Sequence, residues 1–288
     1  MKPQNLKTKI FLDSGDPAET RDVLSFLGFL DGQTTNPSLI AKNPDTVGRK
    51  FSKTELLAFY RNVVEQVSEL IPAGSVSIEV YGDKTTTAED MFTQGQEFNS
   101  WIPNAHIKYP TTQAGLKAAE ISVKEGMRVN MTLVFSQSQA AAVYAATKGA
   151  KKGQVFVSPF VGRLDDRGER GMDLIKNILE MYKKGDRHVE VLTASVRTVE
   201  HLSEAISLGS DILTAPVKTL KEWKDAGQPT SFELQTLASP AGGLTLKPIP
   251  FEEIDLEKPW QEYSIQHELT DRGLEKFAQD WNNLIEQK

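Results

Sequence analysis

A single lysine lies in a short, mostly apolar stretch that ends in a proline and two hydroxyl residues, His106-Ile107-Lys108-Tyr109-Pro110-Thr111-Thr112. A buried lysine is either the partner of a nearby acid or a nucleophile, and only a neutral amine attacks a carbonyl to form a Schiff base. An ordinary lysine has a pKa of about 10.4, so roughly one in a thousand is neutral at pH 7. Burial lowers such a pKa and carboxylates raise it, so this stretch predicts either a structural ion pair or Schiff-base chemistry.

Two arginines follow predicted strands at positions where barrels often bind phosphate. Arg163 ends the stretch Ser158-Pro159-Phe160-Val161-Gly162-Arg163, and Arg197 ends Ser195-Val196-Arg197. The planar guanidinium group fits a phosphate, and the late strands of α/β barrels commonly hold one. Either arginine alone is more typical of a surface or structural residue, whereas two at successive strand ends favour an anion site.

Composition excludes several other chemistries. The 288 residues carry a formal net charge of −6, which argues against a dominant nucleic-acid role. The chain has no cysteine, and its four histidines show neither HxH nor HExxH spacing, so no metal site is expected. Residues 1–10 contain no apolar leader, and no run approaches the roughly 18 apolar residues of a membrane span. We therefore expect a soluble, cytoplasmic protein without a membrane partner.

Short β-rich runs alternate with longer helical patterns, which is typical of βαβ units around a parallel sheet. Eight such units predict a single (β/α)8 barrel domain over residues 1–288, with a doubly wound open sheet as the alternative. Ser52-x-x-Glu55 and Thr86-x-x-Glu89 fit capping boxes at helix starts. The predicted strands are Lys9–Asp13, Phe29–Thr34, Ser75–Tyr81, Ala105–Pro110, Arg128–Val134, Gln154–Pro159, Val189–Ser195 and Asp211–Pro216.

The C-terminal part breaks this alternation. Residues 228–262 carry five prolines and a Gly-Gly pair, which predicts a loop excursion rather than a ninth unit. A last helix is expected over residues 270–286, capped by Thr270, because its apolar residues recur on one face. We expect this helix to cover the barrel. An approach of the excursion to the active site, or a contact in a homo-oligomer, stays open.

Alternate residues of a strand face opposite ways, which assigns a direction to each polar side chain. In the predicted strands one face is apolar and must lie under the helices, so the polar set points into the barrel. Polar groups near the carboxyl ends of barrel strands usually belong to the active site. The inward set that should converge there is Asp13, Glu79, Lys108, Asn130 and Thr132.

Six motifs in order along the chain make the sequence resemble transaldolases. The resemblance covers about residues 9–226, and a further C-terminal stretch, Leu269-Thr270-Asp271-x-Gly273-Leu274-x-x-Phe277, is also similar. The six motifs are Leu12-Asp13-Ser14-Gly15-Asp16, Asp31-Gly32-Gln33-Thr34-Thr35-Asn36-Pro37-Ser38-Leu39-Ile40, Ile107-Lys108-Tyr109-Pro110, Val129-Asn130-Met131-Thr132-Leu133-Val134-Phe135-Ser136, Ser158-Pro159-Phe160-Val161-Gly162-Arg163 and Ala194-Ser195-Val196-Arg197.

The resemblance implies a cofactor-free enzyme on a (β/α)8 barrel that moves a dihydroxyacetone unit between sugar phosphates. Lys108 matches the family's Schiff-base lysine, and Asp13 matches its general acid and base for C–C cleavage. Glu79 and Thr132 match the pair that positions a water molecule. The residues implied for substrate binding are Thr34, Asn36, Asn130, Ser158, Phe160, Arg163, Ser195 and Arg197. Among these, the asparagines would hold hydroxyls of the intermediate, while Ser195 and the two arginines would hold the phosphate.

Two alternatives remain at this point. The family also contains fructose 6-phosphate aldolases, which release free dihydroxyacetone and carry tyrosine and glutamine where this chain has Phe160 and Glu79. These two differences favour transfer over release. A non-catalytic barrel that binds sugar phosphates without turnover is the alternative from another class.

Overall fold

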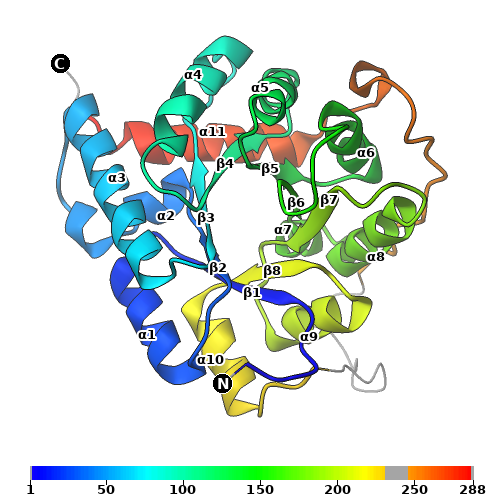
Figure 1. The fold of residues 1–288 in the computed structure, drawn as a ribbon, viewed down its shortest axis with the longest axis horizontal. Helices are drawn as coiled ribbons and strands as arrows, with labels where there is room; N and C mark the ends of the chain where they lie inside the picture. The colour runs from blue at the N-terminus through cyan, green and yellow to red at the C-terminus, as the bar shows by residue number, and fades with distance from the viewer. Residues whose placement is uncertain (1, 231–245, 287–288) are drawn as a thin grey trace.

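Eight parallel strands close into a barrel in the computed structural model, which describes residues 2–230 and 246–286 (Figure 1). The strands are β1 (Lys9–Asp13), β2 (Gly32–Thr34), β3 (Ser75–Glu79), β4 (Ala105–Pro110), β5 (Val129–Val134), β6 (Val155–Pro159), β7 (Val189–Thr193) and β8 (Ile212–Ala215). Each strand pairs in parallel with the next, and β1 pairs with β8. The predicted (β/α)8 barrel is therefore confirmed, and the alternative of an open sheet is wrong.

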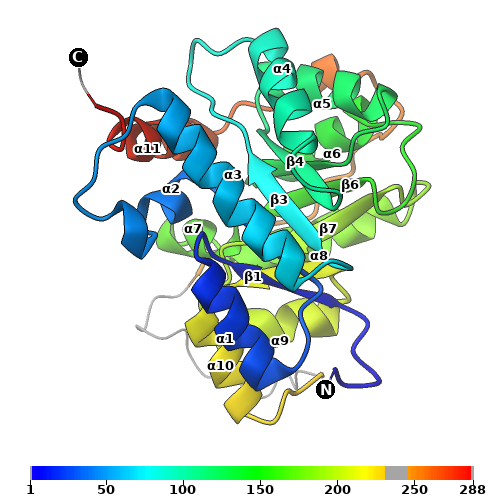
Figure 2. The same ribbon diagram turned by 60° about the vertical axis from the view of Figure 1, so that its left-hand side comes forward.

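Helices surround the ring of strands and cover its outer face (Figure 1, Figure 2). Outward strand residues such as Ile78, Ile107 and Val129 are completely buried beneath them. This burial follows from the apolar outer face of each strand. The helices are α1 (Pro17–Leu27), α2 (Pro37–Ala41), α3 (Lys53–Leu70), α4 (Ala88–Asn99), α5 (Gln113–Lys124), α6 (Gln137–Ala146), α7 (Val161–Asp166), α8 (Gly171–Tyr182), α9 (Val199–Leu208), α10 (Val217–Asp225) and α11 (Glu268–Asn282).

Local capping signals define where two of these helices begin. Ser52 and Glu55 form the predicted capping box at the start of α3. The box of α4 lies one residue later than predicted, because Thr87 accepts the backbone N–H of Asp90 and Asp90 accepts that of Thr87. Both registers fit the same sequence pattern, so the pattern alone does not choose between them.

An aromatic layer fills the barrel below the level of Lys108. The ring of Phe156 stacks on His106 at a centroid distance of 4.0 Å and meets Phe11 edge-on at 6.1 Å. His106 Nε2 donates to the carbonyl oxygen of Gly153 at 3.0 Å, and its Nδ1 lies 2.7 Å from the hydroxyl of Ser75. Phe11, His106 and Phe156 are each nearly buried, so this layer fills the interior on the amino-terminal side of Lys108.

The buried His106 predicts a specific loss of stability in acid. Burial lowers the pKa of His106 from 6.5 to about 3, so between these values the unfolded chain binds a proton that the folded chain does not. The contribution is complete above pH 6.5 and is lost as pH falls toward 3. Between pH 7 and 5, urea unfolding of the wild type should lose about 2 kcal/mol more than that of His106→Gln. Parallel pH dependences in the two chains would contradict this assignment.

The C-terminal helix α11 covers the barrel near α2 and β5. It begins at Glu268 rather than at the predicted 270, because His267 caps it through a hydrogen bond from the backbone N–H of Leu269. It ends at Asn282 rather than at the predicted 286. Thr270 lies in its first turn instead, where the hydroxyl donates to the carbonyl oxygen of Leu133 at 2.9 Å. The first turn of α11 is thus tied directly to a barrel strand.

The predicted excursion over 228–262 lies partly outside the described residues, in 231–245. Its described part runs past α8 and α6 on the outside of the barrel (Figure 1). Asn177 donates to the carbonyl oxygen of Ile249 at 3.0 Å, and Gln137 exchanges hydrogen bonds with the backbone of Glu252. These contacts hold the described part against the outer helices of the barrel.

Gly115 lets α5 begin directly against the end of β4, the strand that carries Lys108. A Cβ atom at Gly115 would collide with the carbonyl oxygen of Pro110, which is backbone and cannot rotate away. We expect Gly115→Ala to lower the free energy of unfolding by about 1–3 kcal/mol in urea. The neighbouring exposed change Gln113→Ala should alter it by less than about 0.5 kcal/mol. Equal stability of both variants would show that the strand end adjusts freely.

Candidate active site

The carboxyl ends of the strands surround a cavity of about 430 Å³ that opens between α2, α7 and α11. Eight residues predicted from the sequence line it together, although they come from distant parts of the chain. They are Asp13, Thr34, Asn36, Lys108, Ser158, Phe160, Arg163 and Ser195. A polar cavity at this end of a (β/α)8 barrel is the usual position of an active site.

Lys108 lies on β4 at the bottom of this cavity and is only 3% exposed. Its Nζ donates to the carbonyl oxygen of Thr35 at 3.1 Å and lies 3.1 Å from Glu79 Oε2. A lysine so nearly buried has little contact with water, so its amine interacts with these two protein oxygens instead. Lys108 is therefore paired with an acid, as the first prediction requires, and it also lies in the cavity, as the prediction of a nucleophile requires.

Asp13 ends β1 and faces Lys108 across the cavity. Its Oδ1 accepts a hydrogen bond from the Thr34 hydroxyl at 2.6 Å, and that hydroxyl also lies 2.7 Å from the hydroxyl of Thr214. Burial raises the pKa of the Asp13 carboxyl, and the charge of Lys108 opposes this rise. A carboxyl with a raised pKa can both accept and donate a proton near neutral pH.

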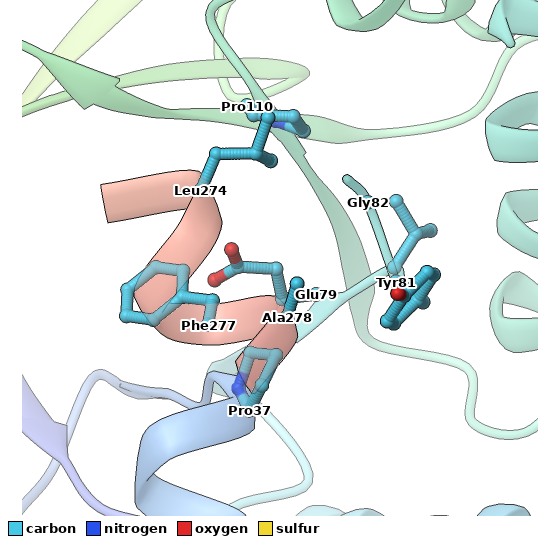
Figure 3. Close-up of a pocket in the computed structure, with 9 residues that line it drawn as sticks. Pro37, Glu79, Tyr81, Gly82, Pro110, Leu274, Phe277 and Ala278 are labelled. Carbon is cyan, nitrogen blue, oxygen red and sulfur yellow. The ribbon is translucent and has the colours of Figure 1, made fainter. Parts of the chain in front are cut away.

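Glu79 ends β3, and its carboxylate extends toward α11, between Leu274 and Phe277 (Figure 3). Burial raises its pKa, while the charge of Lys108 lowers it. Apart from the ion pair with Lys108 Nζ at 3.1 Å, its Oε2 accepts no hydrogen bond from a described residue. Thr132 Oγ1 is likewise buried without a hydrogen-bond partner among the described residues. Buried polar atoms are nearly always paired in proteins, so the unpaired hydroxyl of Thr132 needs a functional explanation.

A hydrogen-bonded row links three strands beneath the cavity. Asn130 Nδ2 donates to the hydroxyl of Ser77 at 3.0 Å, and the hydroxyl of Ser158 donates to Asn130 Oδ1 at 2.7 Å. Asn130 is completely buried, and both ends of its amide are fixed by these contacts. The row therefore holds Ser158 in a defined position on the cavity wall.

The alternation used to assign inward residues fails at one position of β5. The register between β5 and β6 shifts after Met131, and Leu133 has a left-handed φ of 60°. Its side chain does not follow Met131 under the outer helices. A Cβ atom at Gly273 of α11 would meet the end of Leu133, so this leucine packs against α11. β-bulges often lie next to active sites, where they redirect a side chain.

Arg163, from α7, lies between two aromatic rings on the cavity wall. Its guanidinium carbon is 5.2 Å from the ring centre of Phe160 and 5.5 Å from that of Phe277. Burial lowers its pKa, and no described residue forms an ion pair or a hydrogen bond with its side chain. A positioned guanidinium group without a carboxylate partner is suited to bind an anionic ligand.

The other predicted phosphate residues differ in their positions. Ser195 lines the cavity with a left-handed φ of 57°, a conformation that non-glycine residues adopt rarely and often at functional sites. Arg197 is exposed and does not belong to the cavity wall. It forms a two-pronged ion pair with Asp166, in which Nη2 lies 2.7 Å from Oδ2. Its role in phosphate binding stays a prediction.

Asn36 reaches the cavity from the start of α2, where its Oδ1 caps the helix by accepting the N–H of Leu39 at 2.9 Å. Several cavity residues were not predicted from the sequence. Thr214 follows the inward alternation of β8 and was identifiable by that rule. Most of the others come from α2 with its C-cap residue or from α11, and they carry no local signal: Ser38, Leu39, Ala41, Lys42, Lys276, Phe277 and Asp280.

Within residues 2–230 and 246–286, no group of three or more His, Cys, Asp or Glu side chains is arranged to hold a metal ion. No helix in the same described ranges is long and apolar enough to cross a membrane.

The protein is a closed (β/α)8 barrel that carries a buried lysine and two carboxyl groups at the carboxyl ends of its strands. The sequence model for the transaldolase/fructose-6-phosphate aldolase family matches residues 10–288. The chain belongs to this family.

Three relatives illustrate the extent of the similarity. A probable transaldolase of Alkaliphilus metalliredigens (strain QYMF) is 34% identical over 277 residues, 96% of this chain and 99% of its own. Those of Dehalococcoides mccartyi and Brucella ovis are 35% and 36% identical, over 96% and 95% of this chain and 99% and 96% of their own. Among solved structures, a 3-hexulose-6-phosphate synthase from Salmonella typhimurium gives a TM-score of 0.47 at 12% identity, covering 77% of this chain and 100% of its own, which is too low to support an argument.

Proposed function

We propose that this protein is a transaldolase that transfers a dihydroxyacetone unit from a ketose phosphate to an aldose phosphate through a Schiff base on Lys108. The donors are sedoheptulose 7-phosphate or fructose 6-phosphate, and the acceptors are glyceraldehyde 3-phosphate or erythrose 4-phosphate. The observation that carries the proposal is the nearly buried Lys108 amine, 3.1 Å from Glu79 and in the same cavity as Asp13. Names of the relatives support the same activity.

In the proposed reaction the neutral Lys108 amine attacks the C2 carbonyl of the ketose, and protonation with loss of water gives the protonated imine, which can accept an electron pair. The Asp13 carboxylate then takes the proton of the C4 hydroxyl, the C3–C4 bond breaks, and its electron pair moves into the imine system. An aldose phosphate leaves, and a dihydroxyacetone enamine stays bound to Lys108. Addition to the acceptor aldehyde reverses these steps. The hydrogen bond from Thr34 holds Asp13 in place for both proton transfers.

Glu79 and Thr132 are assigned to the water molecule that leaves and returns during imine formation. This role accounts for the buried Thr132 Oγ1, which has no hydrogen-bond partner among the described residues, and for Glu79 Oε2, which faces the Lys108 amine at 3.1 Å. The raised pKa of Glu79 suits a group that alternately accepts and donates a proton. Asn36 would hold a hydroxyl of the intermediate, and Arg163 with Ser195 would hold the phosphate. Asn130 is assigned to the hydroxyls from the family resemblance, and it lies in the hydrogen-bonded row beneath the cavity.

The transfer reading predicts that product formation depends on the acceptor. With fructose 6-phosphate and erythrose 4-phosphate the protein should form sedoheptulose 7-phosphate and glyceraldehyde 3-phosphate. With fructose 6-phosphate alone, free dihydroxyacetone should appear at least about tenfold more slowly, because the enamine waits for an aldehyde. Coupled assays for glyceraldehyde 3-phosphate and dihydroxyacetone measure both.

Two outcomes of this assay would contradict transfer. Rapid release of free dihydroxyacetone without acceptor would identify a fructose 6-phosphate aldolase. No conversion of any substrate would favour the non-catalytic sugar-phosphate-binding barrel. Phe160 and Glu79 favour transfer, since the aldolases of this family have tyrosine and glutamine at these positions.

A further inference from the structure

One cation on the cavity wall has neither a carboxylate partner nor a place in the proposed chemistry. Four cationic side chains line the described cavity: Lys42, Lys108, Arg163 and Lys276. Lys108 lies beside Glu79, and Lys276 forms an ion pair with Asp280. Arg163 is assigned to the phosphate. Lys42 is exposed and forms no ion pair with any residue in the described ranges.

The backbone that carries Lys42 is fixed at the cavity rim. The next residue, Asn43, is buried, and its side chain donates to the carbonyl oxygen of Gly15 at 2.8 Å while accepting the N–H of Asp45 at 2.9 Å. Gly15 approaches α2 so closely that a Cβ atom there would collide with the backbone of Leu39. These contacts join the end of α2 to the loop that follows Asp13, so the base of the Lys42 side chain has a defined position.

A second tie holds the opposite side of α2. The hydroxyl of Ser38 donates to the carboxylate of Asp280 on α11, and Lys276 binds the same carboxylate. Asp280 therefore neutralises Lys276 and leaves Lys42 as the free cation of this part of the wall. The side chain of Lys42, which forms no ion pair within the described ranges, is free to reach a ligand.

The effect of Lys42 on the pKa of Asp13 agrees with a lysine side chain that is directed at the cavity. The positive charges of Lys42 and of Arg163 both act to lower the pKa of Asp13, against the larger effect of burial. A sugar phosphate carries nearly two negative charges at neutral pH, and one arginine balances only one of them. Arg197 is occupied by Asp166 in this structure. A second cation at the cavity rim would balance the second negative charge of the phosphate.

We propose that Lys42 binds the phosphate group of phosphorylated substrates together with Arg163, and so sets the preference for phosphorylated over unphosphorylated aldoses. The proposal rests on the proposed transaldolase function. Lysine suits this task because its ammonium group is a compact charge on a flexible stem, which follows the phosphate without a fixed geometry. Its contact is with the phosphate rather than the reacting carbons, so it acts on binding and not on bond cleavage.

The test compares two acceptors that differ only in the phosphate, glyceraldehyde 3-phosphate and glyceraldehyde, with saturating fructose 6-phosphate as donor. Lys42→Met keeps the length of the side chain and removes the charge. It should raise the KM for glyceraldehyde 3-phosphate roughly tenfold or more, with kcat within about twofold. The KM for glyceraldehyde should stay unchanged, and Lys42→Arg should restore the wild-type preference.

Inorganic phosphate serves as a second probe, because it binds without undergoing reaction. Its inhibition constant should rise in Lys42→Met by about the same factor as the KM for glyceraldehyde 3-phosphate. Lys53→Met is the matched control, since Lys53 is exposed on α3 and does not line the cavity. This control should match the wild type for both acceptors.

Three results would overturn either the assignment of Lys42 or the function on which it rests. An unchanged KM for glyceraldehyde 3-phosphate in Lys42→Met would overturn the assignment. So would an equal loss for both acceptors, because it would mean a structural role or a role in the chemistry. If the wild type itself transfers nothing to either acceptor, the proposed function fails, and with it the basis for this assignment.

Discussion

A Lys108→Met chain should fold and lose transfer activity, with kcat for fructose 6-phosphate and erythrose 4-phosphate reduced by roughly 10⁴-fold or more. Methionine keeps the length of the side chain but has no amine to form the imine. The loss is expected in kcat, because every later step of the proposed reaction uses the covalent intermediate. Coupled measurement of glyceraldehyde 3-phosphate formation gives the rate.

Two controls make this result specific. Lys117→Met removes an exposed lysine from α5, in the same strand–helix unit, and should leave kcat unchanged. A cooperative thermal transition of Lys108→Met near that of the wild type shows that the barrel is intact. Normal turnover by a folded Lys108→Met chain would exclude the Schiff-base mechanism.

Replacing Asp13 should separate C–C cleavage from imine formation. Asp13→Asn keeps the shape and an acceptor for the Thr34 hydroxyl but cannot take up the proton of the C4 hydroxyl. We expect kcat to fall by about 10²–10⁴-fold, the usual contribution of a general acid or base. Reduction with borohydride should still trap the ketose on Lys108, now as the uncleaved adduct. Wild-type kcat in this variant would remove Asp13 from the mechanism.

The same Asp13→Asn substitution should lower activity but raise stability, which provides an independent check. Burial raises the pKa of Asp13 in the folded chain, so above that pKa the folded state carries a carboxylate that is less favourable than in the unfolded chain. Asp13→Asn should therefore unfold at higher urea concentration than the wild type at pH 8. The gain should shrink as pH falls toward the ordinary aspartate value of 3.8. A gain of activity at the expense of stability is common at active sites.

Strand alternation was sufficient to predict much of the site. It assigned Asp13, Lys108 and Asn130 to the barrel interior, where the structure places them. The reason is physical: a strand beneath helices must put its apolar residues outside, so polar residues have only the interior left. The same rule fails at Leu133, because a bulge shifts the register and no residue type in the sequence announces it.

Contacts between distant segments could not be predicted in this way. Phe277 covers Arg163 only because α11 crosses the barrel end, and neither residue signals the other along the chain. The pairing of Arg197 with Asp166 is also a matter of spatial approach, since 31 positions separate them. Sequence patterns describe one strand or helix at a time, whereas these contacts depend on how the elements meet.

The most direct test of the central claim is borohydride reduction of the wild-type protein with fructose 6-phosphate, followed by peptide mapping. One dihydroxyacetone unit should be found on the peptide that contains Lys108, and none without the sugar phosphate. Two other lysines line the cavity, Lys42 and Lys276, so the map distinguishes the nucleophile from its neighbours. An adduct on either of those lysines, or no adduct at all, would contradict the assignment of Lys108.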